Sequence, residues 1–188
     1  MVVFASQISR LVSYFSRRGG GAFSRGNGCS IGAEGPATVA ADDIERQLAA
    51  IRQRVAGRTR PKTLLVFGRE PGTLRQVEAS GGYGFLHDLL ELSGGADVVG
   101  DIRRESVQMS TEMMLARAPE VIIELHYGRS LDQATLESER RVWNALPSMP
   151  AVRLGRIYLL MGDEFVVPGP RIVLAAERFA RTLHPDVF

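Results

Sequence analysis

The chain has 188 residues, 45% of them apolar and 23% charged, which is ordinary for a globular protein and enough for one domain with a substantial core. A formal net charge of only +2 gives no reason to expect a nucleic-acid partner. The single cysteine excludes an internal disulfide and a cysteine-built metal site. No apolar run reaches the roughly 18–20 residues that cross a bilayer.

Residues 1–41 are expected to form a poorly ordered or non-native extension. Apolar residues between Val2 and Phe15 could form a short amphipathic helix, and the Gly/Ser-rich stretch after it is typical of loop or disorder. This Arg- and Ser-rich, acid-poor start resembles an organelle transit peptide. The alternative is an extension left where the chain has been truncated. Polar residues interrupt its apolar part, so no secretory signal is recognisable.

Residues 42–60 predict one amphipathic helix. Asp42 or Asp43 is expected to cap its first turn, and Gly57 to end it. Its buried stripe recurs at helical spacing: Ile44, Leu48, Ile51 and Val55.

Residues 61–188 alternate apolar runs with helical patterns. The runs Thr63–Phe67, Val121–Leu125 and Ile157–Leu160 are typical of buried strands, and further β structure is expected at Val152. Helices are expected between them: Phe85 to Leu92 before Gly94 and Gly95, one opening near Ser110, one over 131–146, and one over 172–183 after Pro168 and Pro170. The fold class predicted is therefore α/β, a three-layer sandwich with a mainly parallel central sheet.

Polar and aromatic residues follow three of these strands. Because the carboxyl ends of parallel strands share one edge of a sheet, Arg69-Glu70, His126-Tyr127-Arg129 and Asp163-Glu164-Phe165 are expected at one rim. The mixture suits a large ligand, partly apolar and partly anionic, better than a bond-breaking centre. The candidate ligand-binding residues are Phe67, Arg69, Tyr83, His126, Tyr127, Asp163 and Phe165.

Several enzyme motifs are absent from the sequence. There is no GxxxxGK[ST] phosphate loop and no GxSxG nucleophile elbow, and Gly82 to His87 begins like a dinucleotide loop but has His87 in place of the last glycine. His87, His126 and His184 are too scattered to indicate a metal site, and His87, set among leucines, is expected to be a partly buried structural residue.

Three phrases in order carry a resemblance to a known family: GFLHDLLELSGGADVVGD, SVQMSTEMMLARAPEVII and VPGPRIVLAAERFARTL. They resemble the C-terminal lobe of periplasmic substrate-binding proteins for vitamin B12 and ferric chelates, the helical-backbone receptors that feed ABC importers. The resemblance covers roughly residues 44–184. It implies that the helix over residues 42–60 is the stiff connecting helix that links the two lobes of such a receptor; the alternative is an ordinary amphipathic surface helix. It implies a non-enzymatic receptor without a resident cofactor or metal, whose ligand is cobalamin, haem or a ferric siderophore.

The resemblance also implies partners and a location. Glu112 matches the surface glutamate with which each lobe of such a receptor docks the arginines of the permease; its first-turn position also suits a carboxylate that only stabilises the helix. Location would be the periplasm or the cell surface. The first lobe, with half of the pocket, is not recognisable in this chain, so weakened binding and self-association through the exposed lobe face are expected.

Two alternatives stay open. One is a small α/β enzyme that uses Arg69, His126 and Asp163 on a phosphorylated or carboxylated small molecule. The other is a remnant or interaction module that binds no ligand.

Overall fold

The computed structural model describes residues 34–128, 131–166, 169 and 171–188. The amphipathic helix predicted near Val2, the rim residue Arg129 and the prolines predicted before the last helix lie outside these residues. The helices are α2 (Glu34–Val55), α3 (Phe85–Leu92), α4 (Thr111–Arg117), α5 (Gln133–Val142), α6 (Pro150–Arg153) and α7 (Ile172–Leu183), with 3₁₀ turns η2 (Trp143–Ala145) and η3 (Asp163–Phe165). The strands are β1 (Lys62–Gly68), β2 (Val77–Gly81), β3 (Ala96–Asp97), β4 (Arg104–Met109), β5 (Val121–His126) and β6 (Ile157–Met161).

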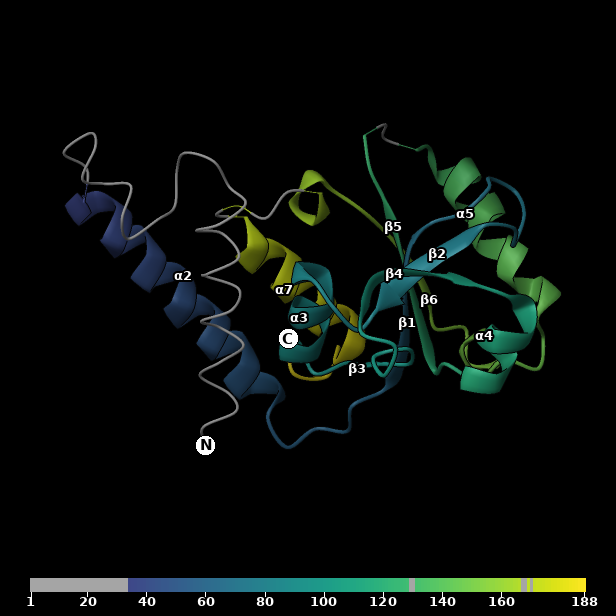
Figure 1. Cartoon of the computed structure of the whole chain (residues 1–188), viewed down its shortest axis with the longest axis horizontal. Helices are drawn as coiled ribbons and strands as arrows, with labels where there is room; N and C mark the ends of the chain where they lie inside the picture. Colours follow the sequence, from purple (N-terminus) through teal and green to yellow (C-terminus); the bar gives the residue numbers. More distant parts are fainter. Residues whose placement is uncertain (1–33, 129–130, 167–168, 170) are drawn as a thin grey trace.

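One sheet organises the described residues, in the order β4-β2-β1-β5-β6, with β3 paired beside the start of β1 (Figure 1). β1 pairs in parallel with β3 and β5, and β5 in parallel with β6. β2 runs antiparallel to both β1 and β4. The mainly parallel sheet expected from the sequence is confirmed, with an antiparallel extension on one side.

Helices cover both faces of this sheet, which makes three layers. Along β1, Leu65 belongs to one buried cluster while Leu64 and Val66 belong to the other, as the two-residue period of a strand requires. Figure 1 shows α2, α3 and α7 on one side and α4 and α5 on the other. A strand buried on both faces has apolar residues at successive positions, which is why the run of β1 could be recognised.

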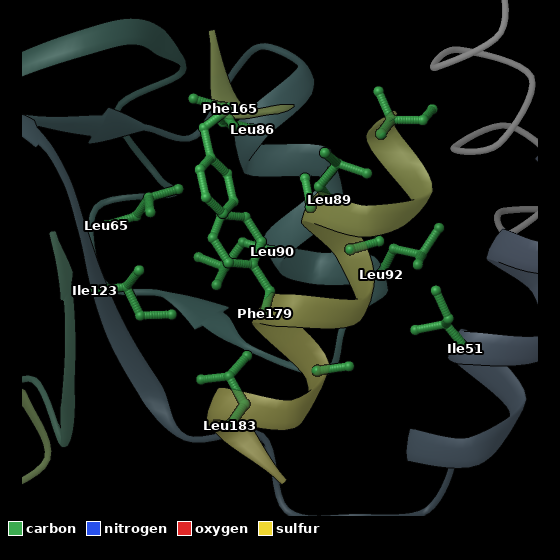
Figure 2. Close-up of a cluster of buried hydrophobic side chains, with 14 of the residues drawn as sticks. Ile51, Leu65, Leu86, Leu89, Leu90, Leu92, Ile123, Phe165, Phe179 and Leu183 are labelled. Atoms are coloured by element: carbon green, nitrogen blue, oxygen red, sulfur yellow. The ribbon is translucent and has the colours of Figure 1, made fainter. Parts of the chain in front are cut away.

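The larger cluster lies under α7. Phe179 of α7 stacks on Phe165 with ring centroids 5.3 Å apart, and leucines of α3 pack beside them (Figure 2). α2 closes this cluster from outside with Leu48, Ile51 and Val55, all buried. The stripe predicted for the connecting helix therefore faces the core.

Three sequence expectations about elements are wrong. Helix α2 begins at Glu34, so Asp42 and Asp43 lie inside it instead of capping it, and Asp43 bonds Arg46 and Gln47 one turn ahead. Val152 belongs to α6, because Pro150 occupies the first turn of a short helix. The helix expected over 131–146 is shorter: Asp132 accepts a hydrogen bond from the backbone N–H of Thr135 and so starts α5 at Gln133.

Candidate functional site

Three parallel strands end at one rim of the sheet. β1 ends at Gly68, β5 at His126 and β6 at Met161, and His126 pairs in register with Met161. The N–H of Gly162 donates to the carbonyl of His126 at 3.4 Å, which ties the turn before Asp163 to the end of β5. The sequence prediction that these loops share one rim agrees with this topology.

A cavity of about 330 Å³ opens at this rim, between the ends of β1 and β5 and one face of α5. Its wall combines two aromatic residues with charged and polar groups, and it holds four of the predicted ligand-binding residues. Its lining residues are Phe67, Gly68, Arg69, Pro71, Glu124, Leu125, His126, Tyr127, Leu131, Thr135 and Glu139.

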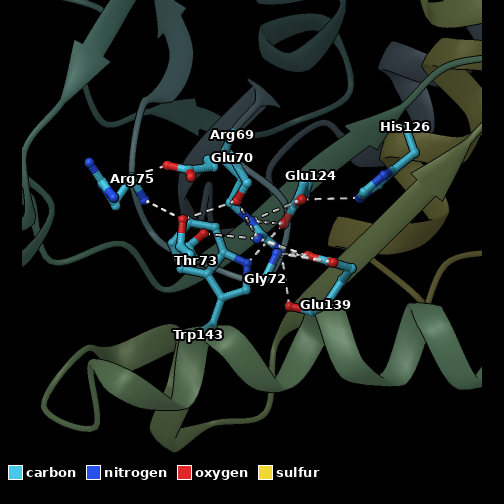
Figure 3. Close-up of polar contacts among 9 residues, drawn as sticks. All are labelled: Arg69, Glu70, Gly72, Thr73, Arg75, Glu124, His126, Glu139 and Trp143. Atoms are coloured by element: carbon cyan, nitrogen blue, oxygen red, sulfur yellow. Dashed lines mark hydrogen bonds and ion pairs between the residues drawn. The ribbon is translucent and has the colours of Figure 1, made fainter.

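Arg69 lies in the wall of the cavity, with its guanidinium held between two carboxylates (Figure 3). Its Nε lies 3.1 Å from Oε1 of Glu124, and its Nη1 lies 2.9 Å from Oε2 of Glu139. Nη1 also donates to the carbonyl of Thr73 at 2.9 Å, and Nη2 to the carbonyl of Glu139 at 3.0 Å. Only 1% of the Arg69 side chain is exposed, so protein groups satisfy this cation from several directions.

Glu124 is a charged residue in the middle of a buried strand. Burial by itself would raise the pKa of its carboxyl, but His126, the positive charge of Arg69 and the indole N–H of Trp143 together lower that pKa below its usual value. The indole Nε1 donates to Oε2 of Glu124 at 2.9 Å. Glu124 is therefore ionised at neutral pH although it is almost fully buried.

His126 and Tyr127 bring an imidazole and a phenol to the mouth of the cavity. Nε2 of His126 lies 3.0 Å from Oε1 of Glu124, an ion-pair distance, yet no described residue gives this buried nitrogen a well-aligned hydrogen bond. Burial raises the pKa of Tyr127 to about 12, although 40% of the residue remains exposed. At neutral pH the phenol is thus protonated and can donate a hydrogen bond.

The remaining predicted residues lie outside the cavity lining. Asp163 begins η3 at the same rim and is exposed. Tyr83 is exposed in the loop between β2 and α3. Phe165 is 1% exposed and belongs to the core beneath α7. The structure therefore brings Phe67, Arg69, His126 and Tyr127 together and leaves Tyr83 and Phe165 apart from them.

Two charged residues of the cavity were missed from the sequence. Glu124 had a detectable signal, because an acidic residue inside the apolar run Val121–Leu125 must find a partner when the strand is buried. Glu139 had none, since it is one of several charged residues on α5 and only the tertiary structure turns it toward Gly72, whose N–H it accepts at 3.1 Å.

Glu112 lies away from the cavity, exposed in the first turn of α4. Ser110 caps this helix by accepting a hydrogen bond from the N–H of Met113 at 3.2 Å. The backbone N–H of Glu112 and the Ser110 hydroxyl lower the pKa of the Glu112 carboxyl. A charged carboxylate is therefore presented to solvent.

No group of three or more His, Cys, Asp or Glu side chains in the described parts of the chain could hold a metal ion. No helix there is long and apolar enough to cross a membrane. Away from the cavity, Nδ1 of His87 donates a hydrogen bond to the buried carboxylate of Asp97 at 2.9 Å. This agrees with the structural role predicted for His87.

Comparison with known proteins decides the family. A family model described as periplasmic binding protein matches residues 32–164, which is more than half of the chain. The chain belongs to the periplasmic binding protein family. Its members are substrate-binding proteins, so the family predicted from the three sequence phrases is confirmed.

Curated members of the family resemble this chain over part of their length. The vitamin B12-binding protein of Salmonella typhi is 30% identical over 144 residues, which are 77% of this chain and 48% of the relative. The vitamin B12-binding protein of Yersinia pestis (strain Pestoides F) is 28% identical over 145 residues, 77% of this chain and 46% of the relative. The chain thus spans about half the length of the curated relatives that it matches.

Solved periplasmic binding proteins share the fold. One from Veillonella parvula DSM 2008 superposes with a TM-score of 0.72 at 24% identity, and the match covers 86% of this chain and 55% of the Veillonella protein. A periplasmic heme-binding protein from Roseiflexus sp. RS-1 gives a TM-score of 0.65 at 19% identity, and the match covers 86% of this chain and 60% of the Roseiflexus protein. These likenesses show the mainly parallel α/β sandwich.

Proposed function

We propose that this chain is a substrate-binding lobe of an ABC importer, and that the cavity at the ends of β1 and β5 forms one wall of a site for a corrinoid or an iron chelate. The observation that carries the proposal is the position of this cavity at the rim where ligands bind in open α/β sheets, in a chain whose curated relatives are vitamin B12-binding proteins. The lobe binds and releases its ligand in the periplasm and catalyses no reaction.

Phe67 and Tyr127 are assigned to contact the faces and edges of a flat, partly apolar ligand. His126 offers its imidazole, and Asp163 stands at the open side of the rim. Arg69 is buried in the cavity wall, where its ion pairs fix the positions of the Glu124 and Glu139 carboxylates. The exposed Glu112 is assigned to dock the permease, since a solvated carboxylate suits an arginine of the partner.

Titration of the purified chain with cyanocobinamide, cyanocobalamin, haemin and a ferric hydroxamate tests the binding role. Quenching of Trp143, the single tryptophan of the chain, reports occupancy, because its indole bonds a carboxylate that lines the cavity. Saturable binding of at least one of these probes is expected, and failure of all of them at the highest soluble concentration contradicts the proposal.

A matched pair of tyrosines locates the site. Tyr127→Ser removes a ring from the cavity wall and is expected to weaken binding about tenfold or more. Tyr83→Ser removes a ring that is more exposed (57%, against 40% for Tyr127) and does not line the cavity, and it should leave affinity unchanged. Equal losses from both variants would place the ligand elsewhere on the lobe.

A second pair of measurements separates docking from binding. Glu112→Lys should leave the affinity for cyanocobinamide unchanged, because Glu112 does not line the cavity. The same variant should lower uptake in cells that depend on this chain. Normal uptake by the Glu112→Lys protein would remove Glu112 from the docking surface.

A further inference from the structure

The described sheet has two edge strands, and the sequence protects only one of them. β4 at one edge presents the exposed charges of Arg104 and Glu105, and its pairing with β2 shifts register. Charges and register shifts are common means by which an edge strand avoids pairing with other molecules. β6 at the other edge has the sequence IYLLM, without charge or proline, and keeps an unbroken register with β5. The edge of β6 is therefore suited to accept a further strand.

Alternate residues of β6 direct their backbone groups away from β5. The carbonyl of Arg156 accepts from β5 at 3.0 Å, and the N–H of Gly162 donates to β5 at 3.4 Å. Every second residue between these two bonds β5 in the same way, so the groups on the free edge belong to Ile157, Leu159 and Met161. Of these groups, only the carbonyl of Met161 has a partner among the described residues, a guanidinium of α7.

A groove of about 230 Å³ runs along this edge, between β6 and α5. It contacts four consecutive residues of β6, Ile157 to Leu160. Because successive side chains point to opposite faces of a sheet, such a groove must follow the edge itself. On α5 it is lined by residues at helical spacing: Gln133, Leu136, Glu137 and Arg140. Other residues of α5 line the cavity at the rim, so the groove and the cavity are separate sites.

The edge of β6 is complementary to itself. A second β6, antiparallel and related by a two-fold axis at Leu159, places Ile157 opposite Met161 and Tyr158 opposite Leu160. Every cross-strand pair is then apolar or aromatic, which is the kind of pair that stabilises a sheet. The outward N–H and C=O groups of one strand meet those of the other across the axis.

The charges of α5 favour a second copy of the chain over an unrelated peptide. Glu137 and Arg140 lie one turn apart in the groove and pair at 2.9 Å, with 34% and 48% of their side chains exposed. The same two-fold axis sets the α5 helices of two copies antiparallel on one face of the joined sheet. Glu137 of each copy then lies toward Arg140 of the other, so the two surfaces are complementary in charge.

We propose that two copies of this chain associate through the free edge of β6, with their α5 helices side by side, so that one sheet continues through both. The self-association expected from the sequence is thereby assigned to the edge of the sheet. The inference goes beyond the proposed function and does not depend on it. A ladder of one short strand and one helix from each copy makes a small interface, so the dimer should be reversible and dependent on concentration.

Sedimentation equilibrium over about 1 to 200 µM of purified chain tests the dimer. The wild type should pass from monomer to dimer in this range. Glu137→Arg and Arg140→Glu each place like charges across the axis, so each should weaken association at least about tenfold. Arg141→Glu is the matched control, since Arg141 is exposed on α5 outside the groove. It makes the same change of charge as Arg140→Glu and should dimerise like the wild type.

An equimolar mixture of the two weakened variants shows whether the partner is a second copy. Glu137→Arg and Arg140→Glu together restore opposite charges across the axis, so the mixture should associate nearly as well as the wild type. Circular dichroism verifies that each variant is folded. If one of the two is not, the loss of the dimer in the other, compared with Arg141→Glu, decides the inference.

Amide hydrogen exchange locates the contact on β6. Exchange at Ile157 and Leu159 should slow as the protein concentration rises through the dimer transition, because their N–H groups become paired. Exchange at Leu160, whose N–H already bonds β5, should change less. Equal exchange at Ile157 and Leu159 in monomer and dimer overturns the pairing of the edges.

A wild type that stays monomeric throughout the concentration range overturns the inference. A dimer that both folded charge variants leave intact forms elsewhere, and it overturns the inference as well. Failure of the mixture to associate also contradicts it, because the charges would then not face each other across an axis. The affinity for cyanocobinamide should be the same in Arg140→Glu and the wild type, so failure of the binding role and failure of the dimer are distinguishable.

Discussion

Arg69 neutralises two carboxylates in a place that water scarcely reaches. Replacement by Met keeps an unbranched apolar stem but removes the guanidinium, and so leaves Glu124 and Glu139 without the cation between them. Breaking a buried ion pair on one side costs roughly 3–5 kcal/mol. We therefore expect Arg69→Met to lower the free energy of unfolding, measured by urea denaturation, by an amount in this range.

Arg75→Met is the matched control for this loss. Arg75 pairs with Glu70 only at 3.5 Å, and 77% of its side chain is exposed, so its removal should change the unfolding free energy by no more than about 0.5 kcal/mol. If Arg69→Met were as mild as Arg75→Met, the ion pairs at the cavity wall would not be present in solution.

His87 gives the fold a pH dependence of defined sign. Burial by itself would lower the pKa of His87, but the hydrogen bond and negative charge of Asp97, with Glu91 and Asp88, raise it above the usual value. A pKa raised on folding adds stability that is complete below the unfolded-state pKa and is lost as pH rises through the folded-state pKa. The difference in unfolding free energy between the wild type and His87→Gln should therefore be larger at about pH 5.5 than at about pH 8.5.

His184 should behave in the opposite way in the same urea experiments. Burial lowers the pKa of His184, whose Nε2 lies 3.3 Å from the carbonyl of Gly94, so its contribution is lost as pH falls. Relative to His184→Gln, wild type should lose stability toward acid. Parallel pH profiles for the two variants would contradict at least one of the two assignments.

At the scale of single residues, sequence reasoning could name the groups at strand ends but could not say which were free. Arg69, His126 and Tyr127 were found because each lies within two residues of the end of a mainly apolar run. That Arg69 is already paired depends on Glu139, which is 70 residues away in the chain. No local pattern in the sequence reports such a contact.

At the scale of elements, α4 depends on its first turn. It has seven residues, too few for a helix to persist alone, and Ser110 satisfies the N–H of Met113. Ser110→Ala should lower the unfolding free energy by about 1 kcal/mol, measured by thermal or urea denaturation. Ser138→Ala, at an exposed interior position of α5, is expected to be neutral or slightly stabilising, and an equal loss there would rule out a capping role.

Strands with a continuous apolar run could be predicted from the sequence, and polar strands could not. β1, β5, β6 and the amphipathic α7 agree with their predicted positions within one or two residues. β2 and β4 were missed, because β2 is rich in small residues and the edge strand β4 begins with exposed charged residues. A charged edge strand avoids pairing with other molecules, and the same charges hide it from a hydrophobic pattern.

At the scale of the whole molecule, parallel strands explain how distant residues share one site. More than fifty residues separate β1 from β5 in the sequence, and thirty separate β5 from β6. The parallel pairing of these strands places their last residues, Gly68, His126 and Met161, at one rim. The parallel part of this topology was predictable from the alternation of strands and helices, whereas the antiparallel strands β2 and β4 were not. The cavity itself was not, since it also needs one face of α5 and the buried pairs behind it.

The most direct test of the account is a ¹⁵N-resolved NMR titration of the chain with cyanocobinamide. Amide shifts should concentrate at the rim, in the turn after β1, at the end of β5 and in the turn after β6, and the amides of α2 and α4 should stay unchanged. Shifts that gather on α2 or α4, or the absence of any shift at saturating ligand, would contradict the assignment of this rim as the ligand-binding wall.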